Sequence, residues 1–370
     1  MSVLEVPLKQ GLLASMTENR LLLELSDAPE GLSRSEIAQR TGISKPAISD
    51  AARRLEESGV IVSTGTRGGK RGGVATVYAI NGDRGHSIAI ALDSMSVSAR
   101  VTTLDGTVVD ELSERLPRGA GRGRVITTAN TMLASIKSGV GSPLLATAVS
   151  MADPVDRNTG EIIVLADAVF PGGHINPLED LHLDPANSSV DNDVNWATLA
   201  EHHVGTMKDN DEFVYVYLGA GLGAGLFIGG AVQRGARGLA GEIGQLQSPG
   251  GRDLTRRLAA LGLGPTGETG GYGLDMEKAS TALSGGEFTA PMREALDIIA
   301  NTISNIVTLL NSSAVVLGGP LASEKSLVDY LTAAIPPQTL DSVAVGVGRC
   351  TPLDGASYEA QRMARAAVGF

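Results

Sequence analysis

The same order of elements occurs twice in this sequence: three strands joined by short turns, followed by helix. The first copy is predicted to have strands at 87–93, 97–104 and 107–109, and a helix at 126–138. The second is predicted to have strands at 213–218, 226–228 and 231–233, a helical stretch at 290–310 and a buried strand at 314–317. Glycine makes up 47 of the 370 residues, which suits many tight corners between strands and helices. The doubled pattern therefore predicts an α/β protein with two similar lobes around a cleft.

Charge is distributed unevenly along the chain. The formal net charge is −11, which taken alone argues against nucleic-acid binding. Residues 1–81, however, hold ten Lys or Arg against nine Asp or Glu, and residues 40–80 hold seven against three. The acidity therefore belongs to residues 82–370, and the turn Asn81-Gly82-Asp83 is the expected domain boundary. A small basic module in front of an acidic body is typical of a DNA-binding domain attached to a sensor domain.

The N-terminal domain has the pattern of a winged helix-turn-helix. Helices are predicted at 17–25, 33–41 and 45–58, and strands at 60–62 and 75–80. Ser33 and Glu36 have the spacing of a capping box at the start of the second helix. Gly42 suits a left-handed turn before the third helix, and Ser44 suits its N-cap. A hairpin with a basic, Gly-rich tip at 64–73 completes the winged arrangement.

The third helix and the hairpin tip are expected to contact DNA. A helix N-terminus presents short polar side chains to the major groove, while a flexible basic loop reaches phosphates. The residues expected at bases or nearby backbone are Ser44, Lys45, Ala47, Ser49 and Asp50, and those expected at phosphates are Arg53, Arg67, Lys70 and Arg71. The alternative is that residues 65–73 are only a flexible linker. A homodimer, or a dimer of dimers, on a palindromic operator is expected for this class of domain.

Three motifs in the C-terminal domain are long enough to be specific. A Gly-rich run extends over residues 218–244 and ends in Ala-Gly-Glu-Ile-Gly. Residues 190–197 are Val-Asp-Asn-Asp-Val-Asn-Trp-Ala, and residues 308–319 end in a Gly pair. Together these motifs resemble the ROK family (repressor, open reading frame, kinase), whose repressor branch also carries a winged helix. The resemblance implies a two-lobed, actin-like or sugar-kinase-like (ribonuclease H-like) domain over residues 82–370.

The resemblance also assigns residues to a ligand site. In family members the residue at the position of Asn192 binds a sugar hydroxyl, and the residue at Asp193 is the general base of the kinases. Glu242 and Gln245 are expected to complete the ligand site. The local alternatives stay open, because Asn192 and Asp193 also fit an Asx-turn and Glu242 also fits a solvated surface acid. The glycines at 219, 221 and 223 equally fit structural corners that bind no nucleotide.

The chain departs from the family pattern in ways that bear on catalysis. Residues 94–97, Ser-Met-Ser-Val, stand where the kinases have a Gly-Gly-Thr loop whose backbone N–H groups hold phosphate. Gln245 replaces a zinc-binding histidine, and Cys350 is the single cysteine of the chain. We therefore expect no catalysis, no metal and no cofactor, with Asp193 as a vestige of the kinase base. The element at 151–156, where the family has a Pro-Gly pair, reads Met-Ala-Asp-Pro-Val-Asp and implies an altered ligand specificity.

These observations predict a DNA-binding transcriptional regulator that represses carbohydrate-utilisation genes. A sugar or sugar derivative in the cleft would control it by binding two states of the protein with different affinity. No stretch reaches roughly 18 consecutive apolar residues, and the N-terminus lacks the features of a signal peptide, so we expect a cytoplasmic protein. Two alternatives remain: an ATP-dependent sugar kinase with an accessory DNA-binding domain, and a regulator that has lost sugar sensing.

Overall fold

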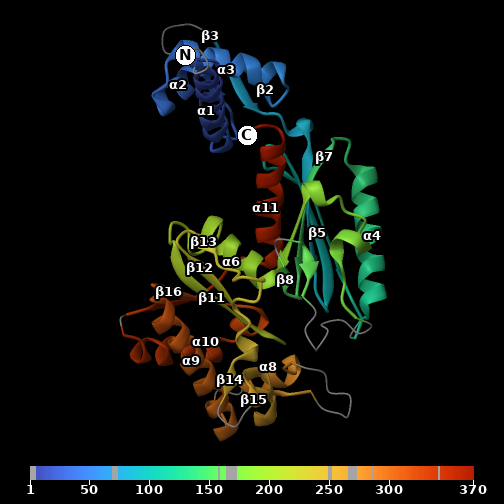
Figure 1. Cartoon of the computed structure of the whole chain (residues 1–370), viewed down its shortest axis with the longest axis vertical. Coiled ribbons are helices and arrows are strands. Elements are labelled where there is room, and N and C mark those ends of the chain that lie inside the picture. The colour runs from blue at the N-terminus through green and yellow to red at the C-terminus, as the bar shows by residue number, and fades with distance from the viewer. Residues whose placement is uncertain are drawn as a thin grey trace, which may run out of the picture.

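The computed structural model describes residues 6–370 apart from residues 69–73, 118, 157–158, 164–172, 249–251, 266–272, 285–286 and 341. Figure 1 shows a small N-terminal domain followed by two lobes, with helix α11 running from the C-terminus beside that domain to the junction of the lobes. None of the helices within the described residues is both long and apolar enough to span a membrane.

The N-terminal domain packs three helices against a three-stranded sheet. Its elements are α1 (Val6–Ser26), β1 (Leu32–Ser33), α2 (Arg34–Thr41), α3 (Lys45–Glu57), β2 (Ile61–Gly68) and β3 (Val74–Ile80), with the strands in the order β1-β3-β2. The capping box is confirmed, because the side chains of Ser33 and Glu36 each accept from the other's backbone N–H. Gly42 has φ of 72°, as the left-handed turn requires. Winged helix-turn-helix architecture is therefore confirmed.

The sequence underestimated the wing. Strand β2 extends to Gly68, well into the stretch expected as a loop, and pairs with β3 from Ile61↔Ile80 to Gly68↔Val74. The interpretation of residues 65–73 as a linker alone is therefore wrong for residues 65–68. The two-residue strand β1 was also missed, because a pair of residues gives no periodic pattern.

The first lobe is built on a five-stranded sheet. Its strands are β4 (His86–Leu92), β5 (Ser96–Thr103), β6 (Val108–Arg115), β7 (Leu144–Met151) and β10 (Ser188–Asn192), in the order β10-β7-β4-β5-β6. Helix α4 (Arg122–Gly139) packs with Ile88 and Ile90 on one face, while α11 (Pro352–Ala367) packs with Ala89 on the other. This alternation follows from the period of two in a strand. A small sheet of β8 (Val155–Asp156) and β9 (Glu161–Ile162) and the short helix α5 (Pro177–Asp180) lie between β7 and β10 in the chain.

The second lobe repeats that topology. Its sheet has β11 (Glu212–Leu218), β12 (Leu222–Ile228), β13 (Ala231–Val232), β16 (Ala314–Gly318) and β17 (Ala344–Val347), in the order β13-β12-β11-β16-β17. In both sheets three antiparallel strands are followed by two parallel ones, so the predicted doubling is confirmed. The other strands and α-helices described in this lobe are β14 (Gln247–Ser248), β15 (Arg252–Asp253), α7 (Leu254–Leu258), α8 (Met276–Ser284), α9 (Ala290–Leu310) and α10 (Lys325–Ala334).

Two helices join the lobes. Helix α6 (Asp193–His203) carries the chain from β10 to the second lobe, and α11 carries it back from β17 to the first. The two helices pack on each other so closely that a Cβ at Gly355 would lie 1.9 Å from the carbonyl oxygen of Trp196. Trp196 is fully buried, and its indole N–H donates to the carbonyl oxygen of Val149 at 2.9 Å.

Candidate ligand cleft and DNA-binding surface

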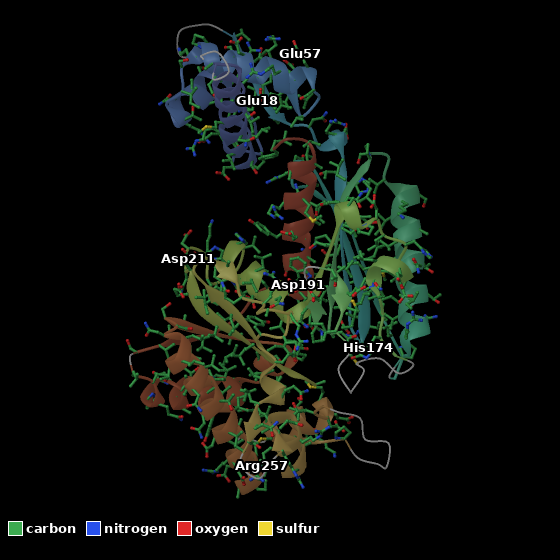
Figure 2. All side chains as sticks on the ribbon, in the orientation of Figure 1. Glu18, Glu57, His174, Asp191, Asp211 and Arg257 are labelled. Carbon is green, nitrogen blue, oxygen red and sulfur yellow. The ribbon has the colours of Figure 1, made fainter. Side chains whose placement is uncertain are left out.

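A cavity of about 970 Å³ lies where the two lobes meet. It is lined by the turn after β4, the start of α6, the loop before β12, the Ala240–Glu242 segment and the segment leading into α11. Figure 2 places Asp191 at this junction and His174 at the edge of the first lobe. The cavity is large enough for a monosaccharide or a larger sugar derivative.

Asn192 has protein partners for both of its polar groups. Its Oδ1 caps α6 by accepting from the N–H of Val194 at 3.0 Å. Its Nδ2 donates to the carbonyl oxygen of Ala152 at 3.3 Å, which ties α6 to the loop after β7. The local capping interpretation is therefore correct for this side chain, while its contact with a ligand stays a prediction.

Asp193 lines the cavity at the first turn of α6. Its Oδ1 accepts from the N–H of Val194 at 2.7 Å. Burial raises the pKa of Asp193 to about 7, and the negative charges of Glu242, Asp93 and Asp153 add to that effect.

Glu242 reaches the same cavity from the second lobe. Gly241 has φ of 89°, and a Cβ there would lie 1.8 Å from the carbonyl oxygen of Ala224, so only glycine lets this segment pack on β12. Burial and the nearby charge of Asp153 raise the pKa of Glu242. The structure thus brings Asn192, Asp193 and Glu242 together, whereas Gln245 is exposed and does not line this cavity.

The sequence missed Asp93, Asp153 and His174. Asp153 is 2% exposed, and its Oδ1 lies 3.4 Å from Nδ1 of His174. Burial raises the pKa of Asp153. Asp93 and Asp153 follow β4 and β7, which are neighbouring parallel strands, and such carboxyl ends are where ligands bind in α/β sheets. The position of Asp93 and Asp153 at the carboxyl ends of strands could have been recognised in the sequence. The approach of His174 to Asp153, in contrast, depends on the tertiary fold.

Of the expected DNA-binding residues, Ser44, Lys45, Ala47 and Ser49 lie at the N-terminal end of α3, Arg53 lies in its C-terminal half, and Arg67 lies on β2. The Oγ of Ser44 accepts from the N–H of Ala47 at 3.4 Å, and Lys45 and Asp50 are exposed beside it. Ala47 and Ser49 are half-buried. Arg53 pairs with Glu57 at 3.0 Å, and Arg67 pairs with Glu36 at 3.2 Å. Lys70 and Arg71 lie outside the described residues.

Two family models match separate parts of the chain. Residues 185–273 match the ROK family model, and residues 15–72 match the MarR family model. The chain carries a ROK family domain and an N-terminal MarR-type winged helix domain.

The curated relatives include repressors and a beta-glucoside kinase of Listeria innocua. A putative xylose repressor of Caldicellulosiruptor sp. (strain Rt8B.4) is 23% identical over 218 residues, which cover 58% of this chain and 54% of that protein. The N-acetylglucosamine repressor of Escherichia coli O6:H1 is 24% identical, over 64% of this chain and 58% of that protein. The chain thus spans about half the length of the curated relatives it matches.

Solved structures share the fold. A ROK family transcriptional regulator, a homolog of the E. coli MLC protein, has a TM-score of 0.71 at 16% identity, covering 96% of this chain and 98% of that one. A ROK hexokinase from Thermus thermophilus has a TM-score of 0.57 at 20% identity, covering 75% of this chain and 97% of that one. The likeness to the regulator extends over the winged helix as well as the ROK domain.

In this ROK domain the turn after β4 is closed on itself. Oδ1 of Asp93 accepts from the N–H groups of Met95 at 2.6 Å and Ser96 at 2.8 Å, and Oδ2 accepts from Oγ of Ser96 at 2.8 Å. These N–H groups therefore already have a carboxylate acceptor. An incoming phosphate would have to displace that carboxylate and would be repelled by its charge.

Proposed function

We propose that this protein is a cytoplasmic transcriptional repressor of carbohydrate-utilisation genes whose DNA binding is controlled by a sugar or sugar derivative in the ROK cleft. The observation that carries the proposal is the path of α11. Its first residues, including Leu353 and Asp354, line the cavity. Just beyond its other end, Val368 and Phe370 pack against the core of the winged helix domain.

The residues that follow α11 contact the winged helix domain through apolar side chains. The domain core includes Leu104 of the first lobe, which is fully buried, and Leu145 packs against it. Nε of Arg365 donates to the carbonyl oxygen of Leu104 at 3.3 Å, close to the same contact. A displacement of α11 along its axis would therefore have to move or repack this surface.

A ligand can shift this arrangement only if it binds two states of the cleft with different affinity. The crossings of the chain between the lobes occur at the start of α6 and just before α11, and both line the cavity. Closing the lobes around a ligand would rotate the packed pair of α6 and α11 as one unit and so move the far end of α11. Relatives named as a xylose repressor and an N-acetylglucosamine repressor support assigning ligand binding to the cleft and DNA binding to the winged helix domain.

The DNA contact is assigned to the N-terminal half of α3, with Ser44, Lys45, Ala47 and Ser49 facing the major groove. Arg53, Arg67, Lys70 and Arg71 are assigned to phosphates. A homodimer or a dimer of dimers on a palindromic operator follows from the symmetry that such domains use.

Catalysis is the second candidate, because a carboxyl with a pKa near 7 suits a general base. The closed Asp93 turn argues against it, since phosphoryl transfer depends on a positioned and neutralised phosphate. We therefore assign no catalytic role to Asp193. Measurable sugar-dependent ATP turnover in a coupled assay would overturn this assignment.

The deciding experiment is selection of genomic fragments bound by the full chain, with and without a sugar panel. We expect a palindromic site near carbohydrate genes, and loss of binding with one class of sugar. Recovery of an operator that no sugar affects would leave a DNA-binding protein without sugar sensing. Failure to enrich any sequence would overturn the regulator itself.

A further inference from the structure

Tyr217 brings an aromatic side chain to the cavity between the lobes. It is the penultimate residue of β11, and it lines the cavity together with Asp193 and Asp93. Its partners on the neighbouring strands are both glycines, Gly223 on β12 and Gly318 on β16. The ring therefore has no cross-strand side chain beside it on either neighbouring strand.

Packing holds the base of the Tyr217 ring, and its hydroxyl end lies over the turn that follows β11. The ring packs against the apolar cluster of β11 and α6 that includes Val194 and Tyr215. A Cβ at Gly219 would lie 2.6 Å from Cε1 and 2.8 Å from the hydroxyl oxygen of Tyr217. The side chain is thus held in position before a ligand arrives, which lowers the entropic cost of binding to it.

The hydroxyl of Tyr217 has no hydrogen-bond partner among the residues that the structure describes. The hydroxyl of Tyr330, in contrast, donates to Asp297. Burial raises the pKa of Tyr217, and the negative charges of Asp193 and Asp93 add to that effect, so the hydroxyl keeps its proton and can donate. A donor at the wall of a cavity without a protein partner is available to a ligand.

We propose that Tyr217 is a specificity-determining residue of the cleft, whose hydroxyl donates a hydrogen bond to an uncharged sugar beside Asp193. This proposal rests on the sugar-controlled function proposed above and adds to it a contact residue and the charge of the ligand.

Tyr217 supplies the donor that the neighbouring carboxylates lack. Ionised Asp93 and Asp193 only accept hydrogen bonds, whereas a sugar hydroxyl both donates and accepts. One sugar hydroxyl at this place can donate to Asp193 and accept from Tyr217. The ring adds an apolar wall, and a few polar groups set in an apolar surface are typical of small-molecule sites.

The same place is unsuited to a phosphate group. The N–H of Gly219 already donates to the carbonyl oxygen of Gly221 at 3.1 Å, and the side chain of Tyr217 covers this turn. The charges of Asp93 and Asp193 act on the Tyr217 hydroxyl from nearby and would repel a second anion.

Two arginines line the cavity, and both have partners within the protein. Arg100 pairs with Glu111 and with Asp354, each at 2.7 Å. Arg349 is exposed and donates to the carbonyl oxygen of Gly205 at 3.1 Å. Among the described lining residues there is no other Lys or Arg to neutralise a phosphate, which favours a neutral ligand.

The first test is calorimetric titration of the full chain with xylose, glucose, mannose, galactose and N-acetylglucosamine, and with the 6-phosphates of the last four. We expect at least one neutral sugar to bind more tightly than its phosphate. Tyr217→Phe should weaken its binding about 3- to 10-fold, the effect of one hydrogen bond. Tyr217→Ala should weaken it further, because the ring contact is lost as well.

Two outcomes of these titrations would count against the proposal. Unchanged affinity in both Tyr217 variants would remove this residue from the site. Tighter binding of a phosphate than of its parent sugar would overturn the assigned charge of the ligand. Tyr330→Phe is the matched control, because it removes a hydroxyl that donates to Asp297 outside the cavity and should leave every affinity unchanged.

Deoxy analogues separate a direct contact from a structural effect. Each single-deoxy analogue of the sugar that binds is titrated into the wild type and into Tyr217→Phe, which retains the ring. One analogue should lose affinity in the wild type and lose no more in the variant, because both changes remove the same hydrogen bond. An equal further loss in Tyr217→Phe for every analogue would show that the hydroxyl acts only on the structure, and the assigned contact would be wrong.

The same titrations are repeated with operator DNA present. A sugar that binds and changes operator affinity equally in the wild type and in both Tyr217 variants would contradict the role of Tyr217 and leave sugar control intact. If no member of the panel binds or changes operator affinity, sugar control fails, and the assignment of Tyr217 fails with it.

Discussion

The carboxylate of Glu201 accepts a hydrogen bond from the backbone N–H of Cys350 at 2.7 Å. Glu201 is fully buried near the C-terminal end of α6, and Cys350 precedes α11, so this contact joins that end of α6 to the segment leading into α11. The same carboxylate accepts from the N–H of Arg349 at 2.5 Å and from Thr206 at 2.8 Å. The arrangement fixes α6 and the start of α11 relative to each other.

Loss of this carboxylate is expected to destabilise the protein. Glu201→Ala removes the acceptor shared by the N–H groups of Arg349, Cys350 and Thr206, and a hydrogen bond to a charged group contributes about 1.5–3 kcal/mol. We expect a large fall in the free energy of unfolding, measured by urea denaturation, and a smaller fall for Glu201→Gln, which keeps one acceptor. Unchanged stability in both variants would show that water replaces the carboxylate.

Phe370 is expected to transmit the ligand signal without contributing to ligand affinity. Phe370→Ala removes an apolar contact between the end of the chain and the winged helix core, far from the cavity. The ligand-dependent change in operator affinity, about 5-fold or more in coupled systems, should fall towards none while calorimetric ligand affinity stays unchanged. Leu340→Ala, at a side chain that is 92% exposed, is the matched control. Retention of the full response in Phe370→Ala would place the coupling elsewhere.

Arg53 and Glu57 are expected to have opposite effects on DNA binding. Their ion pair at 3.0 Å is exposed, so it is weak in itself. Arg53→Ala should weaken binding to all sequences and reduce the salt slope by about 1, because a phosphate contact is lost. Glu57→Ala should strengthen binding, because it removes a negative charge and frees Arg53. Operator titrations over a range of salt concentrations measure both, and an unchanged slope in Arg53→Ala would remove that residue from the interface.

Lys45 and Ser49 are expected to determine sequence preference. Both lie in the first turns of α3, where side chains reach base edges. Lys45→Ala and Ser49→Ala should relax the preference for one or two base pairs in a selection from random DNA, with a cost of about 1–3 kcal/mol per lost contact. Identical selected sites in wild type and both variants would mean that α3 does not read the bases.

Asp193 is expected to make stability depend on pH. Its pKa is about 7 in the folded protein against 3.8 for the unperturbed group, so the folded state binds more protons between those values. The wild-type protein should therefore lose stability as pH rises through this window. Asp193→Asn removes that loss and should be more stable than wild type at about pH 8, with little difference at about pH 4.

The acidic groups that surround Asp193 also titrate, so their contribution has to be separated from that of Asp193. Glu242, Asp93 and Asp153 face Asp193 and titrate in both proteins, so only the difference between wild type and Asp193→Asn is assigned to Asp193. Urea midpoints at several pH values give that difference, with the exposed Asp110→Asn as a charge control. A difference that does not vary with pH would contradict the raised pKa.

Features that depend on neighbours along the chain could be predicted from the residues alone. Ser33 and Glu36 are three residues apart, and their capping box follows from that spacing. Gly42 and the cap by Ser44 are equally local, and the strand-turn-strand order of each lobe follows from apolar runs separated by turn residues. Such contacts require little chain closure, so the residue types at fixed spacing are sufficient to predict them.

Contacts between residues far apart in the chain depend on how the lobes and helices pack. Glu201 and Cys350 are 149 residues apart, and nothing in the spacing of either residue predicts their hydrogen bond. The approach of His174 to Asp153, the unpaired oxygen of Asp153 and the path of α11 likewise depend on how two sheets and two crossing helices pack. The sequence could suggest a ligand site from Asn192, Asp193 and Glu242, but its charge balance became visible only when residues from both lobes were brought to one cavity, because electrostatic interaction depends on distance in space.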